Sequence, residues 1–140
     1  MNYPSKFIVK LPSVISNKRM IQDLSNRVEF FRKSNDQFSK ISIATENMDS
    51  FKSSVLSIST NLYEDLKNQL KQVINTYIDY HVFIGQITGA IYQCMSAVDL
   101  LIHKVNGDSI PALKRRISDI MVYVSKVVFI LIKFQKSIAA

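Results

Sequence analysis

The sequence predicts an all-α protein in which a C-terminal antiparallel helical bundle follows an extended N-terminal helical arm. Only three glycines and three prolines occur among the 140 residues, which favours long helices over short strands joined by turns. Apolar residues recur at alternating steps of three and four through most of the chain, the spacing of helices that bury one face. Hydrophobic residues make up 47% of the chain, enough for a sizeable core. We therefore expect an arm at residues 1–46 and a bundle at residues 47–140.

Residues 1–12 are predicted to form an extended segment. Pro4 and Pro12 lie near the two ends of this stretch, and a proline disfavours the helical conformation in the residue before it. Lys6 and Lys10 are four residues apart, with apolar residues between and after them. A frayed terminus is one interpretation. The apolar content favours another, a segment that lies against a second surface.

A first helix is predicted to begin at a Ser13 cap and to end near Lys40. With Val14 counted as heptad position a, the positive charges of this helix fall at positions e, f and g. We call them the basic ridge: Lys18, Arg19, Arg27, Arg32, Lys33 and Lys40. Its negative charges fall at positions b and c, so we expect one basic and one acidic flank: Asp23, Glu29 and Asp36. The ridge extends for about 21 Å between its two pairs of adjacent cations, a length that can follow a polyanion. A solvated face with charges segregated by chance is the alternative.

A bend is predicted at residues 41–47, where either Thr45 or Asn47 can cap the next helix. A second apolar stripe follows: Met48, Phe51, Val55, Ile58, Leu62, Leu66, Val73, Tyr77 and Ile84. Around residues 77–85 apolar side chains cover all sides of the helix, so a break or kink is expected there.

Two strongly apolar helices between Ile84 and Phe134 are joined by residues 106–111. Gly107 can adopt the left-handed conformation that closes a helix. Either Asp108 or Ser109 can cap the next helix, and the proline that follows fits its first turn. The short connection predicts an antiparallel hairpin.

The formal net charge of +7 suggests an anionic partner, either nucleic acid or a membrane surface. A basic protein without such a partner is the plainer alternative. Lys114, Arg115 and Arg116 form a second basic cluster, at the start of a helix, where positive charge opposes the helix dipole. Residues 82–102 and 120–132 are apolar, but polar residues interrupt the first stretch and the second is too short for a membrane span. Both are predicted to be buried bundle helices, with partial lipid contact left open.

No catalytic or metal-binding set is predicted. His81 and His103 are far apart, and neither has a carboxylate at ligand spacing. Cys94 is the single cysteine, which excludes an internal disulfide, and it lies on an apolar stripe as a small hydrophobic residue. Gly85 and Gly89 lie within a helix and lack the lysine of a phosphate-binding loop. We therefore expect neither enzymatic activity nor a cofactor.

Two blocks of the sequence resemble the major coat proteins of rod-shaped and filamentous archaeal viruses, the rudivirus-like and lipothrixvirus-like families. The first block is Ile87-Thr88-Gly89-Ala90-Ile91-Tyr92-Gln93. The second is Pro111-Ala112-Leu113, with Ile117, Tyr123 and Val124 following. The order and separation of the blocks, within residues 84–125, carry the resemblance. The N-terminal half has no matching motif.

The resemblance implies a structural coat protein that polymerises around linear double-stranded DNA, held in the A-form, to build a helical virion. It implies that the bundle forms the outer wall and that the arm at residues 1–46 wraps the DNA. In the filamentous members two related coat proteins pair as a heterodimer, and a lipid envelope often surrounds the filament. The implied partners are therefore DNA, further copies of the chain, a paralogous coat protein and a lipid envelope.

The DNA-binding residues are predicted to be the cations of the arm, which would contact phosphates without sequence specificity: Lys6, Lys10, Lys18, Arg19, Arg27, Arg32, Lys33 and Lys40. Neutral phosphate contacts are expected from Asn17, Ser25, Ser34 and Asn35. One alternative is a membrane-associated helical scaffold or inserting protein that uses residues 82–134. Another is a coiled-coil adaptor that binds neither DNA nor lipid.

Overall fold

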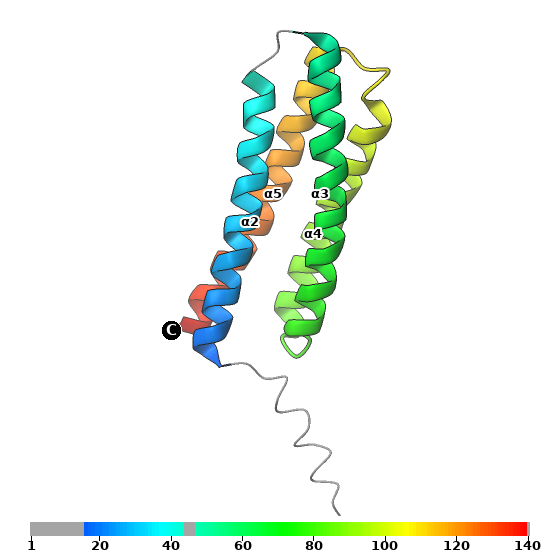
Figure 1. Ribbon diagram of the computed structural model, residues 1–140. Helices are drawn as coiled ribbons and strands as arrows, with labels where there is room; N and C mark the ends of the chain where they lie inside the picture. Colours follow the sequence, from blue (N-terminus) through cyan, green and yellow to red (C-terminus); the bar gives the residue numbers. More distant parts are fainter. Residues whose placement is uncertain (1–15, 44–46, 140) are drawn as a thin grey trace, which may run out of the picture.

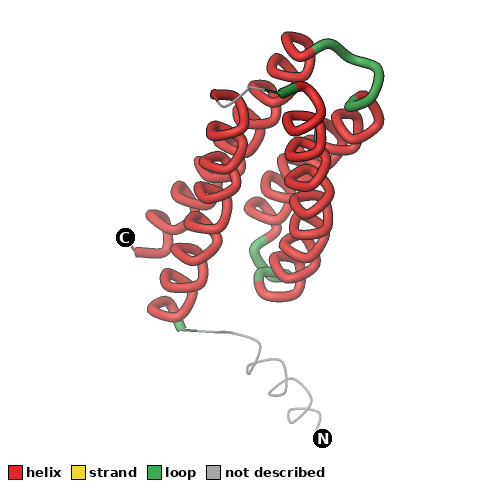
Figure 2. The backbone as a smooth tube through the Cα atoms, turned by 45° about the horizontal axis from the view of Figure 1, so that its top comes forward, coloured by secondary structure: helices red, strands yellow, loops and turns green. Residues whose placement is uncertain are grey.

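The computed structural model describes residues 16–43 and 47–139, which form four α-helices: α2 (Asn17–Ile43), α3 (Met48–Thr76), α4 (His81–Lys104) and α5 (Ile110–Ala139). The helices run alternately up and down in one bundle (Figure 1). Around the bundle, α2 packs against α5, α5 against α4, and α4 against α3, whereas contacts between α2 and α3 are the sparsest of these. Figure 2 shows the same arrangement from a second direction. The prediction of an all-α protein with packed helices is confirmed.

The core is one cluster to which every helix contributes an apolar stripe. On α5 the predicted stripe is fully buried from the first turn to Leu131: Leu113, Ile117, Ile120, Val124, Val127 and Leu131. Phe134 and Ile138, which continue the predicted stripe, are partly buried. On α4 the predicted stripe begins at the partly buried Ile84 and is buried thereafter: Ile87, Ile91, Cys94, Val98, Leu101 and, just beyond the helix, Val105. The spacing of three and four therefore identified the buried faces of the hairpin.

α2 belongs to this bundle. Its residues Leu24, Phe31 and Phe38 are fully or almost fully buried in the common core. Polar contacts to α5 support this packing, since the Asn35 amide donates to the Met121 carbonyl at 3.2 Å. The predicted boundary at residue 46 therefore does not separate this helix from the bundle. Residues 1–15 of the predicted arm lie outside the described residues.

The connections between helices follow the predictions in part. Asn47 is the cap of α3, because its Oδ1 accepts hydrogen bonds from the N–H groups of Asp49 at 2.8 Å and Ser50 at 3.1 Å. The predicted break occurs after Thr76, and α4 begins at His81. No helix within the described ranges has both the length and the apolar character needed to cross a membrane.

The connection between α4 and α5 differs from the prediction at Gly107. This glycine does not have a positive φ, so the left-handed closure is wrong. The N–H groups of Gly107 and Asp108 instead donate to the Lys104 carbonyl at 3.2 and 3.0 Å, which ends α4 in a right-handed turn. Of the two candidate caps of α5, Ser109 accepts from the Ala112 N–H at 3.3 Å.

Candidate nucleic-acid interface

Positive charge is concentrated in α2 and α5. Six lysines and arginines in α2 outnumber three acidic residues, and six in α5 accompany a single aspartate, whereas α3 and α4 contain equal numbers of each sign. Because α2 and α5 pack side by side, the excess charge lies on one side of the bundle (Figure 1). The fold therefore joins two basic segments that are far apart in the sequence.

Five of the predicted DNA-binding residues are exposed on α2: Lys18, Arg19, Arg32, Lys33 and Lys40. Their side chains are accessible to a polyanion approaching this side of the bundle. Lys6 and Lys10 lie outside the described residues.

Arg27 is not part of the exposed surface, although the sequence places it in the basic ridge. Its side chain is 7% exposed. Its guanidinium forms an ion pair with Asp23, with Nε 2.8 Å from Oδ2. Its Nη1 donates to Oε1 of Gln69 at 2.8 Å and of Gln72 at 3.2 Å, which ties α2 to α3. A guanidinium with these donors engaged inside the fold is unavailable to phosphate, so the assignment of Arg27 is corrected.

The predicted separation of α2 into a basic and an acidic flank is wrong. Glu29 lies three residues before Arg32, and Asp36 lies three residues after Lys33, and all four side chains are exposed. Residues three or four apart share one face of a helix. Acidic residues therefore alternate with the cations along the outer face of α2.

Three of the expected neutral phosphate ligands have their polar groups engaged within the bundle. Ser34 is buried and donates to the Phe30 carbonyl at 3.2 Å. The Asn35 amide donates across the α2–α5 contact to the Met121 carbonyl and to Ser125 Oγ, each at 3.2 Å. Across the same contact, Ser25 Oγ accepts from the Gln135 amide at 2.7 Å. These three residues therefore act in packing.

Three exposed cations in the C-terminal half of α5 were not among the predicted DNA-binding residues: Lys126, Lys133 and Lys136. Lys126 lies within the apolar stretch at residues 120–132, which was predicted to be a buried bundle helix. The signal was available, since Lys126 and Lys133 are seven residues apart, two turns of a helix, and Lys136 follows one turn later.

In the second basic cluster, Lys114 to Arg116, one of the three cations is bonded within the chain. Nε of Arg116 donates to Oδ2 of Asp108 at 2.7 Å, and this hydrogen bond lowers the pKa of the Asp108 carboxyl. Lys114 is half-buried, whereas Arg115 is exposed. The aspartate at the start of α5 thus offsets part of the unfavourable placement of cations near a helix N-terminus.

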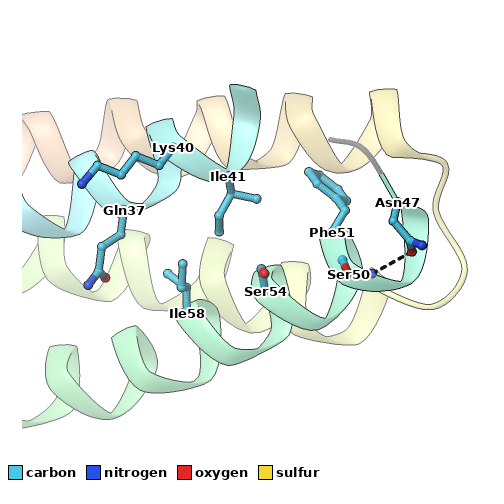
Figure 3. Close-up of a pocket in the computed structure, with 8 residues that line it drawn as sticks. All are labelled: Gln37, Lys40, Ile41, Asn47, Ser50, Phe51, Ser54 and Ile58. Carbon is cyan, nitrogen blue, oxygen red and sulfur yellow. Dashed lines mark hydrogen bonds between the residues drawn. The ribbon is translucent and has the colours of Figure 1, made fainter. Parts of the chain in front are cut away.

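A groove of about 570 Å³ lies between the last turns of α2 and the first turns of α3. It is lined by Gln37, Lys40, Ile41, Asn47, Ser50, Phe51, Ser54 and Ile58, shown in Figure 3. Among the described residues, this lining contains no carboxylate, histidine or cysteine. His81 and His103 lie at opposite ends of α4.

The described residues thus define a four-helix bundle with a cationic side formed by α2 and α5. Comparisons with known protein families, curated proteins and solved structures give no match to the chain.

Proposed function

We propose that the protein is a structural coat protein that polymerises along double-stranded DNA and binds phosphates without reading sequence. The observation that carries the proposal is the excess of exposed cations on the adjacent helices α2 and α5. Both helices are long, and α2 with its 27 residues extends for about 40 Å, so the cationic side can contact a long stretch of duplex.

In this proposal binding is driven by the release of counterions as lysines and arginines neutralise phosphates. Glu29 and Asp36 lie among the cations of α2 and weaken the attraction of a single bundle for DNA. Stable coverage of the DNA duplex then depends on many copies of the protein that bind next to one another. Such dependence fits a coat protein better than a protein that binds one site as a monomer.

The resemblance of residues 84–125 to coat proteins of filamentous and rod-shaped archaeal viruses supports the same proposal and extends it. The extension is a helical virion in which the DNA is A-form, with a paralogous coat protein as a further partner. The segment that carries the resemblance spans α4 and the first half of α5.

Three double variants test the proposal, each of which removes two positive charges. Arg32→Gln with Lys33→Gln acts on α2, and Lys133→Gln with Lys136→Gln acts on α5. Lys67→Gln with Lys71→Gln is the matched control on α3, where both lysines are exposed. Affinity for a linear duplex is measured by fluorescence anisotropy over a range of salt concentrations.

We expect the α2 and α5 variants to lose affinity and to reduce the slope of log K against log salt by roughly two units, since each phosphate contact contributes about 0.9. The α3 variant should change neither quantity beyond the small effect of its altered net charge. Equal losses in all three variants would show that binding depends on overall charge and has no preferred side.

A second candidate function rests on the outer face of α5, where Phe129 and Val122 are exposed beside Lys126 and Lys133. An exposed aromatic residue among lysines fits the headgroup region of an anionic membrane. Sedimentation with phosphatidylglycerol vesicles, compared with phosphatidylcholine vesicles, tests this function. Phe129→Ser should abolish the binding, whereas DNA affinity should be retained.

A further inference from the structure

The outer face of α4 carries a row of exposed residues with the spacing of a helix–helix seam. The row, which we call the outer row, consists of Val82, Gln86, Gly89, Gln93, Ser96 and Leu100. Its steps alternate between four and three residues, the repeat that keeps one line of side chains facing a partner helix. It lies on the exposed side of α4 that borders α5: Val82 and Gln86 line one surface groove with Lys133 and Phe134, and Gln93, Ser96 and Leu100 line another with Arg116 and Asp119.

The outer row contains no lysine, arginine, aspartate or glutamate, although the whole chain has a formal net charge of +7. From His81 to His103, Asp99 is the one exposed residue of α4 with a formal charge. By contrast, the outer faces of α2 and α5 carry several exposed cations each. Of these three helices, α4 is the one whose own exposed face carries no cation before Lys104, and the charged residues of α5 that border the row are Lys133, Arg116 and Asp119.

The packing of the chain itself does not use the glycine of this row. A Cβ atom added at Gly89 would meet no atom within 4 Å, so no neighbouring element requires its absence. A glycine inside a helix lowers helix stability. A close approach by a second helix gives this position a role that the monomer does not.

We propose that α4 pairs with α4 of a second copy of this chain, antiparallel, about a two-fold axis that crosses the outer row at the level of Ile91, midway between Gly89 and Gln93. Pairing about this point places Val82 opposite Leu100, Gln86 opposite Ser96, and Gly89 opposite Gln93. Every member of the outer row then faces another member, as an isologous interface requires. The exposed apolar residues at the two ends cover each other, and the small residues in the middle permit close approach.

The charges beyond the ends of the row are complementary in this arrangement. Lys104 is exposed at the C-terminal end of α4, and Asp79 is exposed just before its N-terminal end. Antiparallel pairing brings the lysine of each copy to the aspartate end of the other. A parallel pair would place like charges together at both ends. The charge pattern therefore selects the antiparallel orientation.

This contact leaves the α2 side of the bundle free, because α2 and α4 lie diagonally across the bundle from each other. It does not depend on DNA binding and is measured without DNA. A failure of the proposed DNA-binding function and a failure of this dimer are therefore separate results.

Sedimentation equilibrium of the full chain tests the pairing, with Leu100→Glu and Leu56→Glu as matched variants. Leu100 is 46% exposed on α4 and Leu56 is 42% exposed on α3, so neither substitution should disturb the core. We expect a wild-type dimer and a rise in its dissociation constant of roughly tenfold or more for Leu100→Glu, or about 1.4 kcal/mol. Leu56→Glu should leave the constant unchanged. A monomeric wild type, or equal effects of the two variants, would overturn the proposal.

Cysteine cross-linking tests the orientation. A mixture of the Gln86→Cys and Ser96→Cys proteins should form a covalent dimer on mild oxidation, because the two positions face each other in the antiparallel pair. Either protein alone should cross-link poorly, and Cys94 is fully buried and should not contribute. Efficient cross-linking of Ser96→Cys by itself would mean that the helices are parallel and would refute the arrangement.

Discussion

The hydroxyl of Tyr77 donates a hydrogen bond to Oδ2 of Asp23 at 2.5 Å and so joins the end of α3 to the first turns of α2. The same carboxylate accepts from Arg27, so one acidic side chain bonds to two residues where α2 and α3, which share few contacts, meet. The ring of Tyr77 also packs edge-on against Phe83 and Phe134. This corner therefore holds all four helices together.

Tyr77→Phe removes this hydrogen bond and keeps the aromatic packing. We expect a loss of about 1–2 kcal/mol in the free energy of unfolding, since the bond is partly buried and its acceptor is charged. Urea denaturation followed by circular dichroism measures the change. Tyr92→Phe is the control, because Tyr92 is exposed on α4 and should change stability by less than about 0.5 kcal/mol. Equal effects of the two variants would mean that the Tyr77 hydroxyl contributes nothing specific.

Arg27→Gln tests whether this residue acts in stability or in DNA binding. A neutral amide cannot replace the ion pair with Asp23 or the hydrogen bonds to Gln69 and Gln72, so we expect destabilisation of about 3 kcal/mol. DNA affinity, measured on the folded fraction, should stay unchanged because the guanidinium is buried and engaged within the fold. Arg32→Gln, at an exposed position of the same helix, is the matched comparison and should lower DNA affinity without loss of stability. Loss of DNA affinity without loss of stability would return Arg27 to the DNA-binding set.

The sequence was sufficient to predict the helices, because burial repeats along each of them with the helical period. It was insufficient to place α2, because an amphipathic stripe looks the same whether it packs within its own chain or on another molecule. The error about the charged flanks has a simple geometric cause. Heptad position b lies between positions e and f around a helix, so Glu29 falls between basic positions.

The candidate site was predicted only in part for a related reason. Arg27 at position g and Arg32 at position e have the same charge and flank the same apolar seam, and only the packing of α3 against α2 shows that Arg27 is buried. The contribution of α5 depends on its position beside α2, a tertiary fact that spacing along the chain does not contain. The conformation of Gly107 could not be predicted either. A glycine permits a left-handed turn but does not require one, and the turn at this position is right-handed.

Val124→Asp is expected to prevent folding, because Val124 is fully buried in the core and the substitution would bury an unpaired charge. The free energy of unfolding should fall by more than about 4 kcal/mol, a large part of the stability of a small domain. Val122→Asp places the same side chain two residues away, at a position that is 61% exposed, and should fold normally. Thermal melts of both variants give the comparison. A cooperative melt of Val124→Asp near the wild-type temperature would contradict the assignment of this face to the core.

Stability should fall at alkaline pH because burial raises the pKa of the Cys94 thiol from its ordinary value of 9.0 to about 12. Between these values the unfolded thiol has lost its proton while the folded thiol retains it, so the folded state binds more protons and its stability decreases as the pH rises. The slope from this group approaches about 1.4 kcal/mol per pH unit within that window and vanishes below pH 9. Burial, with the hydrogen bond to Asp23, also raises the pKa of Tyr77, which adds a decrease of the same sign above pH 10.

Cys94→Ala separates the two contributions. It should cost a similar amount of stability at every pH up to 9, and the loss of stability between pH 9 and 10 should become shallower than in the wild type. Urea denaturation at half-unit steps of pH measures both effects. An unchanged slope in this variant would assign the alkaline loss to groups other than the thiol. Slow reaction of the wild-type thiol with iodoacetamide at pH 8 should accompany the result, since the protonated, buried sulfur is a poor nucleophile.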